Sequence, residues 1–173
     1  MARGAVMARG AVMARGAVMN VESLTAKQVM SRILVAIRPE ESSLMAWELM
    51  RRGDVHHLPV VEDGHVLGVL TREDVAASWS GGPEEQFRRQ VRGLLGSRRR
   101  PRVQPDTSLS EVAVVMLDAG CDAIPVVSEE GLIGLITARD VLAAVAGRVK
   151  AADRPGEVVT GMFHLDPVLP AGD

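Results

Sequence analysis

The sequence contains two copies of one unit, and this duplication restricts the fold more than any other feature. Shifted by 66 residues, the stretch 56–75 (HHLPVVEDGHVLGVLTREDV) aligns without a gap on 122–141 (DAIPVVSEEGLIGLITARDV). The preceding stretches, 38–53 and 104–119, align in the same register. An internal repeat of this kind predicts two equivalent supersecondary units that bury a shared core.

Each copy has the pattern of a β-α-β-β-α unit. A short strand (35–37 and 102–103) precedes a helix that ends near Gly53 or Gly120. The second of these helices begins with a capping box at Ser108–Glu111, which the first copy lacks. Continuous apolar runs then predict buried strands, which return through a strong turn at 63–64 and a weaker one at 130–131.

A strand–helix–strand order implies a parallel pair, and a tight turn adds an antiparallel neighbour. Each copy is too short to bury the resulting mixed sheet alone, so the copies are expected to pack face to face around a pseudo-two-fold axis. The predicted class is α+β. The predicted organisation is a repetitive segment 1–19, repeat one at 20–80, a connecting amphipathic helix at 81–95, repeat two at 96–150 and a tail at 151–173.

The two ends of the chain give weaker signals. The hexapeptide MARGAV occurs three times before Met19, and its arginines would lie about 120° apart around a helix, so no polar face forms. This segment is expected to be disordered. In the tail, residues 166–170 (DPVLP) align on 101–105 (PRVQP), which suggests an extra strand packed on a sheet edge or on a partner.

Composition narrows the functional classes. A formal net charge of −2 argues against nucleic acid as a partner. The single cysteine, Cys121, excludes an internal disulfide and a cysteine-based zinc site, and it favours a cytoplasmic setting. No apolar run approaches the roughly 20 residues of a membrane span. His56 and His57 are neighbours on a strand, so they point to opposite faces and are badly placed to share a metal.

The motif Thr-x-x-Asp occurs at equivalent places, as Thr71 with Asp74 and as Thr137 with Asp140. One interpretation is a helix-capping box, which needs no ligand. The other is a binding site, in which the hydroxyl contacts a phosphate oxygen at a helix N-terminus and the carboxylate accepts hydrogen bonds from ribose hydroxyls. The two interpretations are compatible.

Residues 20–147, with the prolines, hairpins and the G-h-h-T-x-x-D signature (h, aliphatic) in both copies, resemble the cystathionine-β-synthase (CBS) domain pair, or Bateman module. The resemblance implies a pseudo-symmetric pair with two clefts, dimerisation of pairs, and adenosine ligands such as AMP, ADP, ATP or S-adenosylmethionine. It also implies that the threonine contacts phosphate and the aspartate contacts ribose in each copy. The residues expected to bind ligand are Thr71, Asp74, Thr137, Asp140, Gly68, Gly134, Pro59, Val60, Pro125, Val126, Arg72 and Arg139.

Other candidates remain open. Arg98, Arg100 or Arg102 can reach ligand phosphates or belong to a solvated linker, and Cys121 is expected to be an inert, half-buried thiol. The sequence therefore predicts a regulatory adenosine-nucleotide-binding module with no catalytic activity, no metal and no cofactor beyond that ligand. Its expected partners are a second copy of the chain and a further, unidentified protein. The alternative is a ligand-free module for dimerisation or protein interaction.

Overall fold

The structure is a computed structural model that describes residues 23–79, 82–96, 101–149, 156–160 and 164–168. The MARGAV segment lies outside the described residues. Each repeat contains the predicted hairpin, formed by β2 (His57–Glu62) with β3 (His65–Thr71) and by β4 (Ala123–Ser128) with β5 (Gly131–Thr137). The hairpins have the same register, with Pro59 opposite Val69 and Pro125 opposite Leu135, and both have a β-bulge at the same place.

The two turns differ as the sequence indicated. Asp63 and Gly64 both have positive φ, 49° and 78°, as a two-residue hairpin turn with the twist of its strands requires. In the second hairpin the loop residues are 129 and 130, one position earlier than predicted, and Gly131 is the first residue of β5. A Cβ on Gly131 would lie 2.5 Å from the carbonyl oxygen of Gly64, so the two hairpins meet at their turns.

The long helices, α2 (Ser43–Gly53) and α5 (Leu109–Ala119), begin as predicted. Ser108 and Glu111 form the capping box, whereas Ser42 only accepts a hydrogen bond from the N–H of residue 45. Gly120 ends α5 in the left-handed region with φ 61°, but in α2 the residue in that conformation is Asp54, not Gly53. The closing helices are α3 (Arg72–Ala77) and α6 (Ala138–Val145).

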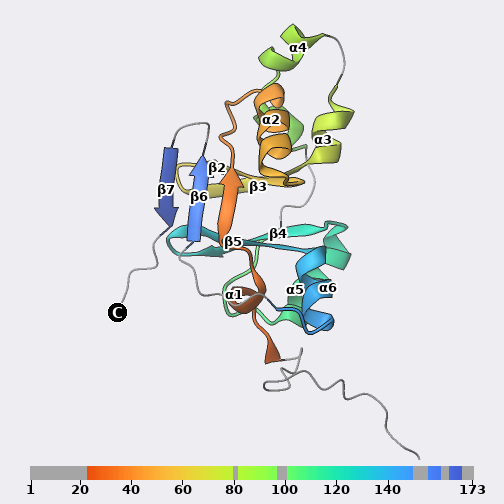
Figure 1. Ribbon diagram of the computed structural model, residues 1–173, viewed down its shortest axis with the longest axis vertical. Coiled ribbons are helices and arrows are strands. Elements are labelled where there is room, and N and C mark those ends of the chain that lie inside the picture. The colour runs from red at the N-terminus through yellow and green to blue at the C-terminus, as the bar shows by residue number, and fades with distance from the viewer. Residues whose placement is uncertain (1–22, 80–81, 97–100, 150–155, 161–163, 169–173) are drawn as a thin grey trace, which may run out of the picture.

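The hairpins lie one above the other at the centre of the molecule, with α2 and α3 on the outer side of the first and α5 and α6 on the outer side of the second (Figure 1). Apolar side chains fill the space between the two hairpins, among them Leu34, Ala123 and Leu135. Each repeat has a further core between its hairpin and its helices. The predicted α+β arrangement of two face-to-face repeats is therefore confirmed.

The segment before each repeat packs into the other repeat. Leu24 and the short helix α1 (Ala26–Val29) belong to the core of repeat two, and the N–H of Leu109 donates to the carbonyl of Leu24 at 2.9 Å. Val91, in the linker, is fully buried in the core of repeat one, and its N–H donates to the carbonyl of Glu41 at 2.8 Å. The sequence-based division at residues 20–80 and 96–150 did not anticipate this crossing.

The linker is not one continuous amphipathic helix. It consists of α4 (Pro83–Arg88) and the 3-10 helix η2 (Val91–Leu94), separated where Arg89 adopts an extended conformation. Phe87, an apolar residue of α4, is 69% exposed. Next to the break, the side chains of Gln86 and Arg89 donate hydrogen bonds to the carbonyl of Ser78 at 3.3 and 2.6 Å.

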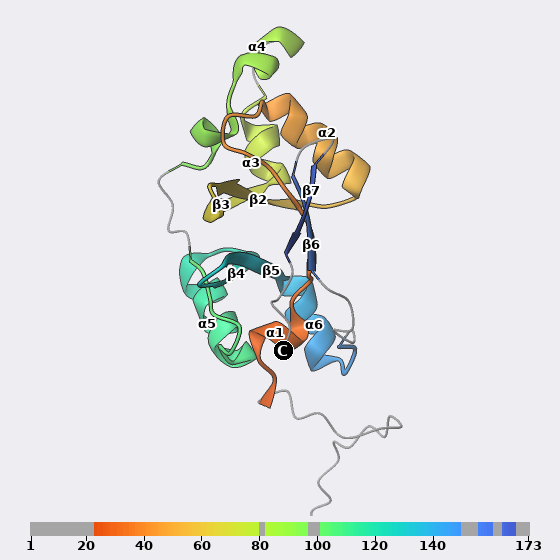
Figure 2. The same ribbon diagram turned by 90° about the vertical axis from the view of Figure 1, so that its left-hand side faces the viewer.

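The first strand and the tail pair with each other. β1 (Ile33–Ala36) lies parallel to β6 (Gly156–Thr160), and β7 (His164–Val168) completes an antiparallel hairpin with β6. Figures 1 and 2 show this hairpin beside β1. The parallel strand pair predicted within each repeat is reduced to a single bridge. It joins Ile37 to Val60 in repeat one and Val103 to Val126 in repeat two. Within the described ranges, every helix is too short or too polar to span a lipid bilayer.

Candidate functional site

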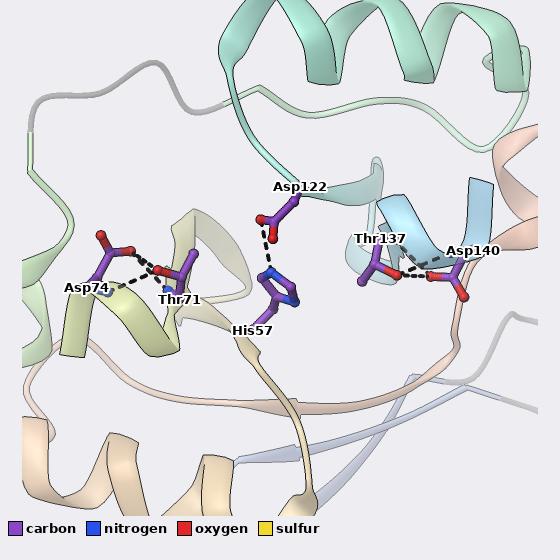
Figure 3. Close-up of polar contacts among 6 residues, drawn as sticks. All are labelled: His57, Thr71, Asp74, Asp122, Thr137 and Asp140. Carbon is purple, nitrogen blue, oxygen red and sulfur yellow. Dashed lines mark hydrogen bonds and ion pairs between the residues drawn. The ribbon is translucent and has the colours of Figure 1, made fainter. Parts of the chain in front are cut away.

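Both Thr-x-x-Asp motifs form capping boxes (Figure 3). The hydroxyl of Thr71 donates to Oδ2 of Asp74 at 2.7 Å, and the N–H of Asp74 donates to Thr71 Oγ1 at 3.0 Å. The corresponding distances for Thr137 and Asp140 are 2.7 and 3.4 Å. Among the hydrogen bonds of the described residues, neither carboxylate uses its Oδ1. Capping therefore occupies one oxygen of each aspartate and leaves the other able to accept.

Each threonine lines a cavity between the two repeats. The first cavity, about 300 Å³, has Thr71 and Asp74 on one wall and Asp122 and Pro125, from repeat two, on the other. The second, about 580 Å³, has Thr137 and Arg139 on one wall and, from repeat one, mainly Leu34, His57 and Pro59. Both volumes fall in the range of about 300–1,000 Å³ typical of small-molecule sites. Each cavity thus joins a threonine of one repeat to a proline of the other.

Of the predicted glycines and valines, only Gly68 lines a cavity. Gly68 lines the first cavity, but an added Cβ on Gly134 would overlap the side chain of Met30, which covers it. Val60 and Val126 were predicted as cleft walls, yet both are fully buried in the cores of their own repeats. The adjacent prolines face the cavities because successive strand residues point to opposite sides of a hairpin.

The two predicted arginines are not equivalent. Arg72 turns away from the first cavity: its Nη2 donates to the carbonyl of Val55 at 3.4 Å, and its guanidinium carbon lies 6.0 Å from the centre of a ring of Trp47. This geometry is that of a cation–π contact within repeat one. Arg139 instead lines the second cavity. Asp140 does not line that cavity, although Asp74 lines the first.

Among the residues that line the cavities, sequence reasoning did not predict Glu73, Asp122 or His57 as ligand contacts. Glu73 lines the first cavity together with Thr71 and aligns with Arg139, so the 66-residue shift alone is a signal that could have found it. Asp122 borders both cavities and contacts His57, with 3.0 Å between Oδ1 and Nε2. In the view of Figure 3 this pair lies between the two capping boxes. No sequence pattern predicts it, because the two residues come from different repeats.

The remaining candidate residues are Cys121 and the arginines of residues 98–102. Cys121 is half-buried at the first cavity, and burial raises the pKa of its thiol. Arg102 lines a groove beside α5 instead. Arg98 and Arg100 lie outside the described residues. Within the part of the chain that the structure describes, no group of three His, Cys, Asp or Glu side chains is placed to hold a metal ion.

Comparison with known proteins supplies the family. The family model described as "CBS domain" matches residues 26–81 and 91–147, together more than half of the chain. An inosine-5'-monophosphate dehydrogenase of Korarchaeum cryptofilum is 29% identical over 137 residues, which are 79% of this chain and 27% of that relative. The chain spans about a quarter of the length of the first curated relatives that it matches.

Solved structures show the same fold. The CBS domain pair of protein MJ0100, in complex with 5'-methylthioadenosine and S-adenosyl-L-methionine, matches with a TM-score of 0.62 at 20% identity, over 72% of this chain and 98% of that one. The cytosolic domain of the Mg²⁺ channel MgtE, in complex with ATP, matches with a TM-score of 0.58 at 28% identity, over 69% of this chain and 48% of that one.

Proposed function

The chain belongs to the CBS domain family, and from this premise we propose that it is a regulatory module that binds an adenosine nucleotide or S-adenosylmethionine between its two repeats. One observation carries the proposal. Thr71 and Thr137, the residues predicted to contact ligand, each line a cavity of ligand size formed by both repeats. A ligand that touches both walls binds the assembled pair and not the separate repeats, which is how occupancy can alter the arrangement of the pair.

The chemistry of the cavities suits a nucleoside. Val69 and Pro125 in the first cavity, and Leu34 and Pro59 in the second, provide apolar surface for a purine ring. Asp74 keeps one carboxylate oxygen outside its capping box for a ribose hydroxyl. The structurally similar MgtE domain was solved with ATP, and the MJ0100 pair with adenosine compounds, which supports the same ligand class here.

The module acts without catalysis of its own, through a homodimer or a further protein. Exposed apolar side chains on repeat two support association. Four large ones on α5 and α6 are 54–81% exposed: Val114, Leu117, Leu142 and Val145. Neither a membrane nor a nucleic acid is proposed as a partner. The net charge of −2 supports the second of these exclusions.

A thermal-shift panel tests the proposal. AMP, ADP, ATP, S-adenosylmethionine and NAD are each added to the full chain at millimolar concentration. A ligand at about 100 times its dissociation constant stabilises the folded state by about 2.7 kcal/mol, so at least one adenosine compound is expected to raise the melting temperature. No shift with any of the five would contradict the proposal. GTP serves as a control for the purine base.

A second candidate function is a ligand-free module for dimerisation. The capping boxes favour it, since they give the Thr-x-x-Asp motifs a structural role worth about 1 kcal/mol each without any ligand. Dimers that persist while the whole panel leaves the melting temperature unchanged would support this candidate instead.

A further inference from the structure

The two cavities carry opposite charges at equivalent positions. Glu73 and Arg139 align under the 66-residue shift, both occupy the second position of their helices, and both are exposed. Glu73 lines the first cavity and Arg139 lines the second. The same backbone position therefore presents an anion to one cavity and a cation to the other.

The other acids on the cavity walls balance, two in each cavity, so the exchange of Glu73 for Arg139 sets the difference in charge. In the first cavity the ionisable acids are Glu73, Asp74 and Asp122, and no cationic side chain lines it among the described residues. In the second, Arg139 and two histidines face two acids, Asp54 and Asp122. Arg139 makes no ion pair within the described part of the chain, so its guanidinium is available to a ligand.

We propose that the two clefts select different ligands: the cleft of Thr137 and Arg139 takes a phosphorylated adenosine nucleotide, and the cleft of Thr71 and Glu73 takes an adenosine derivative without phosphate. The proposal rests on the proposed function and adds a division of ligand class between the two sites. The carrying observation is the exchange of Glu73 for Arg139 at equivalent backbone positions on the two cleft walls.

Electrostatics explains the selection. A phosphate in the second cleft gains charge-assisted hydrogen bonds from Arg139, whose fork geometry suits two phosphate oxygens. A phosphate in the first cleft would face three carboxylates, and like charges a few ångströms apart oppose binding. Asp74 there retains an oxygen for a ribose hydroxyl, which every adenosine derivative with a free ribose offers.

Cys121 provides a readout for one cleft only. It is the single cysteine of the chain and it lines the first cavity. Because burial raises the pKa of its thiol, alkylation by iodoacetamide is measured at alkaline pH, where the thiolate forms. A ligand in the first cleft slows this reaction, and a ligand confined to the second leaves its rate unchanged.

The test uses AMP and S-adenosylmethionine as probes on the full chain, with calorimetry for affinity and stoichiometry. In the wild type, S-adenosylmethionine is expected to protect Cys121, whereas AMP binds at one site without protecting it. R139E should weaken AMP binding at least tenfold. E73R should create a second AMP site, raise the AMP stoichiometry from one to two and allow AMP to protect Cys121. Both substituted residues are exposed, so folded variants are expected, and circular dichroism checks this.

Arginines 98–100 precede Pro101, which lines the first cavity, and they lie outside the described residues. The variant R98A/R99A/R100A therefore completes the test. The proposal is overturned if AMP protects Cys121 in the wild type, and loss of that protection in the triple variant would assign the phosphate to these arginines. It is also overturned if R139E leaves the affinity for AMP within twofold. If both probes bind in the same cleft, the division of ligand class between the clefts is wrong and the proposed function stands. If neither probe binds, the proposed function is wrong as well.

Discussion

Repeat one and repeat two share a backbone but present different surfaces. Their hairpins match residue for residue, including the bulge, and their closing helices begin with the same capping box. At the exposed positions of the helices, by contrast, Glu48 and Arg51 in repeat one align with Val114 and Leu117 in repeat two. At the clefts, Glu73 aligns with Arg139.

This comparison separates what the fold needs from what a function can use. A hairpin register and an N-cap tolerate few residue types, because one wrong residue loses a turn, a hydrogen bond or a buried contact. Exposed positions on a helix tolerate almost any residue, since substitutions there usually change stability by less than about 0.5 kcal/mol. The two surfaces can therefore differ in ligand and partner while the cores stay equivalent.

The largest expected loss of stability concerns the N-terminal segment, which packs into the core of repeat two. Leu24 is 2% exposed in the core of repeat two, so L24A should destabilise the protein by about 2–5 kcal/mol. Amide hydrogen exchange should show lost protection first in α5, β4 and β5. The mirror variant V91A should affect α2, β2 and β3 instead. If L24A reduced protection mainly in repeat one, the crossed packing would be wrong.

The next effect distinguishes the two clefts. Asp74 lines its cavity and Asp140 does not. D74A should therefore cost about 1.5–3 kcal/mol of binding to S-adenosylmethionine, a tenfold weakening or more. D140A should weaken the binding of AMP by a smaller factor. Calorimetry at a temperature well below unfolding measures both. E111A removes a capping-box acid that borders neither cleft and controls for the loss of the cap itself. Equal affinities in all four proteins would leave both aspartates with a capping role only.

The association surface gives a third test. Leu117 is 81% exposed on α5, and Arg51 occupies the equivalent position on α2. L117E replaces the most exposed of these apolar side chains by a charge, so the dissociation constant of the proposed dimer should rise at least tenfold, as measured by analytical ultracentrifugation. R51E introduces the same side chain in repeat one and should leave that constant unchanged. If R51E raised the dissociation constant and L117E left it unchanged, the interface would lie on α2.

The smallest effect concerns the capping box that only α5 has among the long helices. Hydrogen bonds from the side chain and backbone N–H of Ser108 hold the pKa of Glu111 below its usual value. A carboxyl with a lowered folded pKa stabilises the fold above its unfolded pKa of about 4.3, and this contribution disappears as the pH falls through the folded pKa.

Chemical denaturation at several pH values checks this. E111Q should be less stable than the wild type near neutral pH, and the two stability curves should converge in acid. E130Q, which removes an exposed acid from the second hairpin loop, is the charge-matched control. A gap between E111Q and wild type that persists below both pKa values would assign the effect to packing.

The sequence by itself determined the duplicated unit, the hairpins, the capping boxes and the family, because these depend on residues close together in the chain. Turn type, N-cap geometry and strand alternation are local consequences of residue identity, and their sequence signals occur in both copies of the repeat. The same signals identified Thr71, Thr137, Pro59 and Pro125, all of which line the cavities.

Only the tertiary structure decided how the parts meet. Val60 and Val126 pack in the cores of their repeats while the neighbouring prolines, which are also buried, line the cavities, and Met30 covers Gly134 from a segment about 100 residues away. The exchange of opening segments and the contact of His57 with Asp122 join residues far apart in sequence. Local propensities carry no information about such contacts, since these depend on the packing of whole elements.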